Sequence, residues 1–234
     1  MRQSRRTHLW AATRPSWLRD GGMVLVILMA GVFGLYAIGE GDFGLFSADR
    51  ATSQFFSSQA PLSNTAIFSH MWLGGVVTIL VPLQAIGWLR SKLPALHRAL
   101  GYLIAALAFA TAMGGLAYIV LRGTQGGWPM SLAFAAYGLL MLAAAVQTLR
   151  HARAGWVTHR DWALRLVVLI LGSWLYRVHY GLWYMATGGL ASNEAFTGAF
   201  DLINLVAFYL PYLIALELWL RVRPSARPEP SAPA

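Results

Sequence analysis

Four histidines lie within long apolar segments of the sequence or at their ends: His70, His97, His159 and His179. Imidazole nitrogen binds haem iron, and side chains on facing helices of a bundle are a common way to hold such a cofactor. The positions of the segments predict that His97 and His159 lie near one face of a membrane, and that His70 and His179 lie near the other. They therefore form two candidate pairs of axial ligands for haem b, at two depths.

Glycine follows two of these histidines at a helical spacing. Gly74 comes four residues after His70, and Gly101 comes four residues after His97. Residues i and i+4 share one face of a helix. Each histidine is thus expected beside a strip without side chains, against which a flat macrocycle or a neighbouring helix can lie.

The same histidines have a simpler interpretation. His97 and His159 are each followed by arginine, so a basic rim at the cytoplasmic face would give the same pattern. His70 lies inside an apolar stretch, where ionisable residues are rare and usually functional. His179 stands among aromatic residues that are typical of an outer interfacial belt: Tyr176, Tyr180, Trp183 and Tyr184.

Arg177 is a cation within an apolar segment, and it needs a partner because placing it in hydrocarbon is costly. The candidates are Asp201, Glu194 and a haem propionate, since arginine binds carboxylates in a bidentate way. Further arginines can meet propionates at the inner face, although ordinary positive-inside placement explains them equally: Arg98, Arg160 and Arg165.

Two other polar residues lie in apolar surroundings. Gln84, two residues after Pro82, is expected to cap the carbonyl groups that the proline frees or to line a cavity. Glu217 is expected to be a paired or snorkelling carboxylate near the inner end of the last segment. The pairs Gly74-Gly75 and Gly114-Gly115 are expected to allow neighbouring helices to approach closely.

The elements that must position these residues are six apolar segments. Of the 234 residues, 57% are hydrophobic and 12% are charged, whereas soluble domains average about 25% charged. A spanning helix needs about 20 apolar residues and satisfies its own backbone hydrogen bonds. The sequence therefore predicts an all-α integral membrane bundle of six helices, approximately Met23–Ile38, Ile67–Leu89, Leu100–Leu121, Met130–Leu149, Ala163–Ala186 and Phe200–Leu220.

The basic residues predict the orientation of the bundle. All of the 18 Lys and Arg residues except Arg50, Arg122 and Arg177 fall in segments on one side. By the positive-inside rule that side is the cytoplasm, so both termini are expected there, in the inner membrane of a bacterium. The net charge of +9 is then an orientation signal and an affinity for anionic lipid, and no nucleic acid partner is expected.

The sequence divides into a basic cytoplasmic tail (1–22), the transmembrane domain (23–221) and a Pro-rich tail that is expected to be disordered (222–234). The first segment is expected to be retained rather than cleaved as a signal peptide, because no A-x-A site follows it. Without cysteine there are no disulfides and no thiolate metal sites, and the common nucleotide-binding and hydrolase motifs are absent.

From 68 to 185 the chain resembles a bacterial family of multi-pass membrane proteins that is known only as a domain of unknown function. The resemblance is carried by His70-Met-Trp-Leu-Gly-Gly, Pro82-Leu-Gln84, His97-Arg98-Ala-Leu-Gly101 and His159-Arg160-Asp-Trp-Ala-Leu-Arg165, followed by Tyr176-Arg177. It implies membrane location and fold, and it singles out the polar positions within these motifs. His179 is not part of the family pattern.

A looser resemblance is to the six-helix cytochromes b that move electrons from ascorbate across membranes. These proteins also use His-Arg-x-x-Gly elements and histidines on four central helices. Here the fourth apolar segment has no histidine between Met130 and Leu149.

We therefore expect a haem b redox protein with a possible redox partner, in which His97 and His159 are the better ligand pair. The alternative is a cofactor-free transporter or membrane scaffold whose buried His, Gln and Arg bind a small anion or a lipid head group. The oligomeric state and the number of haems stay open.

Overall fold

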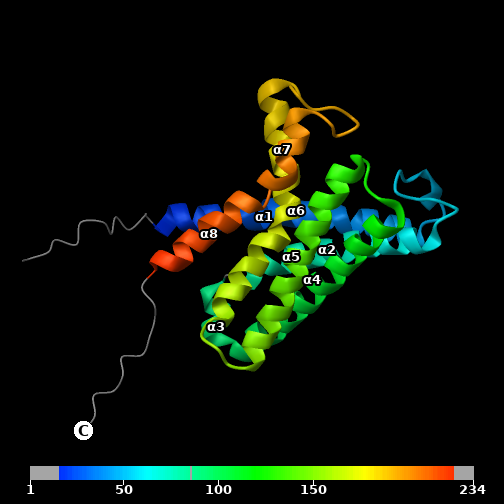
Figure 1. Ribbon diagram of the computed structural model, residues 1–234. Helices are drawn as coiled ribbons and strands as arrows, with labels where there is room; N and C mark the ends of the chain where they lie inside the picture. Colours follow the sequence, from blue (N-terminus) through cyan, green and yellow to red (C-terminus); the bar gives the residue numbers. More distant parts are fainter. Residues whose placement is uncertain (1–15, 85, 224–234) are drawn as a thin grey trace, which may run out of the picture.

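The computed structural model describes residues 16–84 and 86–223, and these residues are helical apart from short connections (Figure 1). The predicted tails therefore lie mostly outside the described residues. The helices are α1 (Ser16–Phe46), η1 (Arg50–Thr52), α2 (Pro61–Gln84), α3 (Gly87–Lys92), α4 (Pro94–Arg122), α5 (Gly127–Arg153), α6 (His159–Thr187), α7 (Ala199–Ala207) and α8 (Leu210–Val222).

Six helical stretches are long and apolar enough to cross a membrane, which confirms the predicted multi-pass α-helical architecture. They are α1, α2, α4, α5, α6 and the combined stretch of α7 and α8, residues 199–222. The short helix α3 carries Arg90 and Lys92 in the connection between the second and third spans.

Helix α1 continues past the predicted end at Ile38 and reaches Phe46. The extension packs on α2 through two glycines. A Cβ on Gly41 would lie 2.7 Å from the carbonyl oxygen of Phe68, and one on Gly44 would overlap the Phe68 ring. The apolar run ends at Glu40, but the close approach to α2 keeps the following residues helical.

The interior of the bundle is formed by α2, α4, α5 and α6. Helix α4 packs between α2 and α5, and α5 packs on α6. Most buried side chains in this interior are apolar, among them Val77 and Val81 from α2, Ile104 from α4, Met141 from α5 and Leu166 from α6. Buried threonines lie on the same helices: Thr78, Thr111 and Thr148. The centre of the bundle is thus filled by side chains.

The last span is broken between α7 and α8. Pro211 has no backbone N–H and lies in the first turn of α8, two residues after the non-helical Tyr209. At the break, Phe208 is fully buried, and its ring meets those of Phe134, Tyr137 and Tyr176 at centroid distances of 5.8, 4.9 and 5.3 Å. The break therefore inserts an aromatic side chain into the core.

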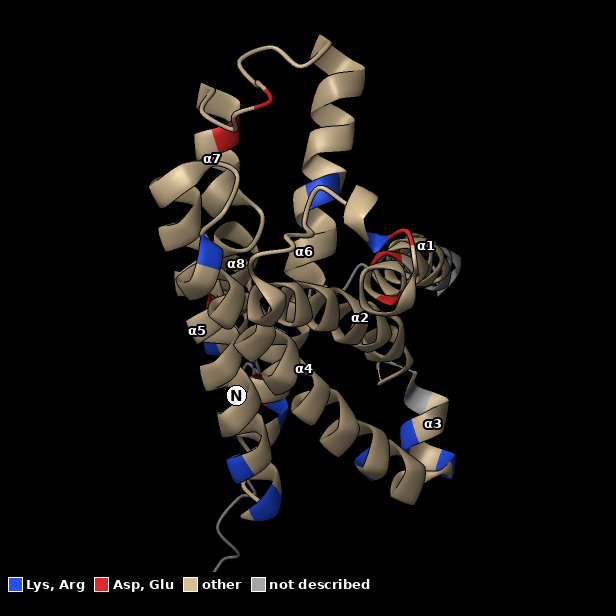
Figure 2. Cartoon of the chain, turned by 90° about the vertical axis from the view of Figure 1, so that its right-hand side faces the viewer, with Lys and Arg blue, Asp and Glu red and all other residues tan. Residues whose placement is uncertain are grey.

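Both ends of the described chain lie on the same side as α3 and the α5–α6 connection (Figure 1). Basic residues mark α3 and the lower part of the bundle in Figure 2, and acidic residues mark α1 and the surroundings of α7. We call the side with α3 the basic end and the other side the outer end. That the basic end faces the cytoplasm stays a prediction from the positive-inside rule.

The α1–α2 contact yields a matched pair of glycine substitutions. A Cβ on Gly75 would lie 2.5 Å from the Gly34 carbonyl oxygen, whereas one on Gly31 would meet nothing within 4 Å. We expect Gly75→Ala to lower the free energy of unfolding by about 1–3 kcal/mol through overpacking. Gly31→Ala should leave stability unchanged or raise it by up to about 1 kcal/mol, because alanine is the better helix former.

Thermal unfolding of the two variants in the same detergent measures this difference. Equal melting temperatures would contradict the close packing of α1 on α2.

Candidate functional site

His159 begins α6 at the basic end, and a backbone group of α5 holds its ring. Its Nδ1 lies 3.2 Å from the carbonyl oxygen of Thr148. Because a carbonyl oxygen only accepts hydrogen bonds, Nδ1 carries the proton and the neutral ring keeps a lone pair on Nε2. Metal-binding histidines are commonly oriented by such a bond from the other ring nitrogen.

His97 lies in the first turn of α4, also at the basic end. Its Nδ1 is buried and has no hydrogen-bond partner among the described residues. The His97 carbonyl oxygen accepts a bond of 3.0 Å from Nε2 of Gln84. Gln84 therefore caps a carbonyl group of α4 and not those freed by Pro82 in its own helix.

His97 and His159 both lie at the basic end, in the first turns of α4 and α6. Beside them, Gly101 keeps the open strip that its spacing predicts, since a Cβ there would meet only Gln84 Nε2, at 3.8 Å. We call His97, His159, Gln84 and Gly101 the basic-end site. Two candidate arginines of this end, Arg98 and Arg160, are exposed.

Arg165 differs from these arginines because it is already paired. Its Nε donates to Glu217 Oε1 at 2.5 Å and its Nη2 donates to Oε2 at 2.9 Å. The guanidinium also lies over the Trp162 ring, 4.7 Å from its centroid. Arg165 therefore fastens α8 to α6, and Glu217 is the paired carboxylate that was expected. A second ion pair between the same helices joins Arg223 to Asp161.

His70 lies in the outer half of α2 with its Nδ1 2.8 Å from the carbonyl oxygen of Thr111 on α4. As in His159, this bond leaves the lone pair on Nε2. The surrounding glycines are used for helix packing: a Cβ on Gly74 would lie 3.3 Å from Thr111, and one on Gly115 would lie 2.9 Å from the His70 ring. Both glycine pairs thus have the predicted packing role.

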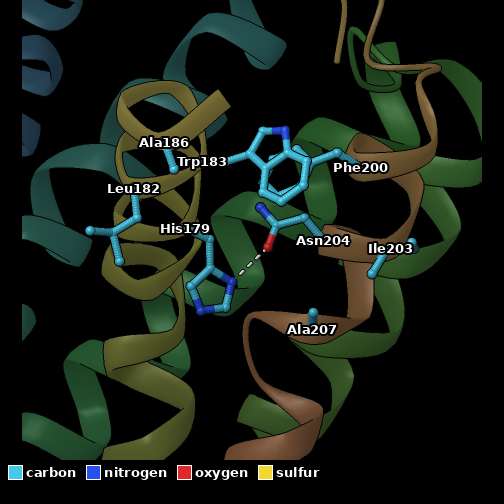
Figure 3. Close-up of a pocket in the computed structure, with 8 residues that line it drawn as sticks. All are labelled: His179, Leu182, Trp183, Ala186, Phe200, Ile203, Asn204 and Ala207. Carbon is cyan, nitrogen blue, oxygen red and sulfur yellow. Dashed lines mark hydrogen bonds between the residues drawn. The ribbon is translucent and has the colours of Figure 1, made fainter. Parts of the chain in front are cut away.

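His179 uses both ring nitrogens in bonds to the last span. Nδ1 lies 2.8 Å from Asn204 Oδ1 (Figure 3), and Nε2 lies 2.8 Å from the Tyr212 hydroxyl. The ring therefore has no free nitrogen for iron. It borders an open apolar pocket of about 380 Å³ between α6 and α7, where Trp183 and Phe200 stack with centroids 4.7 Å apart.

Asp201 is fully buried and organises the outer loop between α6 and α7. It accepts bonds from the hydroxyls of Tyr180 and Ser192 and from the backbone N–H groups of Asn193 and Gly198. All its partners are thus local, and the expected ion pair with Arg177 is not formed.

Arg177 is exposed on α6 and forms no ion pair with Glu194 either. Its Nη1 donates to the Ser173 carbonyl oxygen at 3.2 Å, and its guanidinium lies 4.9 Å from the centre of the Phe33 ring on α1. These contacts use one of the five N–H groups of the Arg177 guanidinium and one of the two faces of its plane.

Sequence reasoning missed the partners that orient the histidines. Thr111 and Thr148 act through their backbone oxygens, which have no signal in the sequence. Asn204 is a buried amide in an apolar segment and could have been singled out for that reason. Tyr212, by contrast, meets His179 only because the chain breaks between α7 and α8.

No protein-family model, curated protein or solved structure matches the chain. No family is therefore identified, and the resemblances to the family of unknown function and to the cytochromes b gain no support. The apolar helical stretches described above support an integral membrane protein with several helical spans.

The pairing of Arg165 with Glu217 gives a test of how α8 is held. We expect Glu217→Ala to lower the free energy of unfolding by about 1 kcal/mol, because it removes two charge-assisted bonds from a partly exposed pair. Thermal unfolding measures the loss, and the exchanged pair Arg165→Glu with Glu217→Arg should recover part of it. A Glu217→Ala protein as stable as the original would contradict a fastening role.

Proposed function

We propose that this membrane protein binds one haem b at the basic-end site, with His97 and His159 as axial ligands, and that it transfers electrons. The observation that supports the proposal is the hydrogen bonding of the two imidazole rings. His159 is held by Thr148 with its Nε2 free, and His97 has a buried Nδ1 that no described residue satisfies. A buried polar nitrogen without a partner is costly, so the His97 ring has a hydrogen-bonding group that the described residues leave unsatisfied.

The surroundings of the two rings suit a flat, anionic macrocycle. The open strip at Gly101 leaves space beside His97. The exposed Arg98 and Arg160 can meet propionates from the basic rim, since arginine binds carboxylates in a bidentate way. Arg165 is not included in this role because Glu217 already engages it.

The haem would supply one-electron chemistry, and the chain would hold it and adjust its potential. Thr148 fixes the ring orientation of one ligand through its carbonyl oxygen. Gln84 fixes the first turn of α4 that carries the other ligand. A site at the end of the bundle is accessible to a redox partner in the compartment that this end faces, which we propose is the bacterial cytoplasm.

We do not propose a second haem at the outer end. His179 has no free ring nitrogen. The space beside the glycines around His70 is filled, because α2 and α4 pack against each other there. One haem alone does not carry electrons across the whole membrane, so the proposed role is an electron carrier at one face.

Purification from cells with ample haem tests the proposal. We expect a Soret band and a reduced-minus-oxidised spectrum of six-coordinate low-spin haem b. His97→Ala and His159→Ala should each lower the haem content by about tenfold or more, since even outer partners of a ligand contribute that much. Any residual haem should be five-coordinate and high-spin.

His151→Ala is the matched control, because His151 lies at the same end and bonds only to the exposed Thr158 hydroxyl. It should keep the spectrum of the original protein. A protein without a Soret band after haem-replete expression, or with an unchanged spectrum in both ligand variants, would overturn the proposal.

A further inference from the structure

The guanidinium of Arg177 lies near the middle of the α6 span. Arg177 is ten residues from the outer end of α6 at Thr187, which corresponds to about 15 Å along the helix. Its side chain does not snorkel toward the outer surface. It turns back toward Ser173, one turn farther from that surface, and donates to the carbonyl oxygen there.

Helix α1 also contacts Arg177. Phe33 lies against one face of the guanidinium. Tyr36, one turn farther along α1 and on the same face as Phe33, is 56% exposed. Its hydroxyl has no hydrogen-bond partner among the described residues. Tyr36 is ten residues from the end of α1 at Phe46, just as Arg177 is ten residues from the end of α6 at Thr187. The Tyr36 hydroxyl and the Arg177 guanidinium therefore belong to residues at matching distances from the outer ends of their helices.

The charge of Arg177 is not balanced within the described chain. The ion pairs there join Arg165 to Glu217 and Arg223 to Asp161, and Asp201 is fully engaged by its own loop. Neither of its printed contacts, the Ser173 carbonyl oxygen and the Phe33 ring, carries a charge. An unpaired cation at this depth is costly, and such residues mark binding sites in membrane proteins.

We propose that Arg177 and Tyr36 form a binding site, between α1 and α6, for a carboxylate carried on an apolar molecule. The guanidinium has N–H groups left to bind both carboxylate oxygens, and the Tyr36 hydroxyl can donate a further bond. The molecule enters sideways from the lipid, because Arg177 and Tyr36 are both exposed on the surface of the bundle. A phospholipid phosphate stays at the interface, whereas a weak acid can reach this depth in its neutral form.

A free fatty acid fits this chemistry. The propionates of a haem on His97 and His159 do not, because Arg177 lies 18 residues from His159, about 27 Å along α6. Native mass spectrometry of the full chain in a nonionic detergent distinguishes a fatty acid adduct from a haem adduct, because the two differ in mass. Stearate, methyl stearate and haem are titrated in turn. We expect one stearate to bind in preference to its uncharged ester.

Arg177→Gln should weaken stearate binding by about tenfold or more, to the level of the ester, since bonds to charged groups contribute that much. Arg177→Lys should retain part of the affinity, and Tyr36→Phe should lose a few-fold while keeping the charge. Arg122→Gln is the matched control, because Arg122 donates to a backbone oxygen, that of Phe55, and faces the outer loop. It should bind stearate like the original protein.

Equal binding of stearate and its ester would overturn the inference. A loss of stearate binding in Arg122→Gln equal to that in Arg177→Gln would also overturn it. The result is separate from the proposed function, since His97→Ala should leave the stearate adduct unchanged.

Discussion

The structure depends on one constraint: a polar group placed in hydrocarbon must find its partner within the protein. The histidine rings show how the chain meets it. His70 and His159 each bond to a backbone oxygen on a neighbouring helix, and His179 bonds to two side chains of the last span. Each bond also ties two spans together. Polar residues are therefore the fixed points of a bundle whose centre is apolar, and the ring that lacks such a bond, His97, stands out.

A second group of contacts depends on residues that have no side chain. Gly34 and Gly75 bring the backbones of α1 and α2 together, and Gly114 and Gly115 bring α4 against the His70 ring. In lipid the attraction between helices comes mostly from such close packing, because apolar side chains gain little by leaving the lipid. The glycines thus determine which helix can approach which histidine, and Gly101 leaves open space beside His97.

The number of spans, their approximate bounds and the placement of basic residues at one end could be predicted, because length, hydropathy and charge are local properties of the sequence. The role of the glycine pairs and the pairing of Glu217 could be predicted for the same reason. The end of α1 could not, since it depends on contact with Phe68. Nor could the partners of Arg177 and His179, because Asp201 is taken by its own loop and the turn at Phe208 brings Tyr212 to the imidazole.

The interruption of the last span gives its two halves separate attachments. The outer half is held by the loop around Asp201, and the inner half by the bidentate pair of Arg165 and Glu217. Between them Asn204, Leu205, Phe208 and Tyr209 are buried in the bundle. His179 on α6 bonds to Asn204 in the outer half and to Tyr212 in the inner half. One imidazole ring therefore ties both halves of the interrupted span to the same helix.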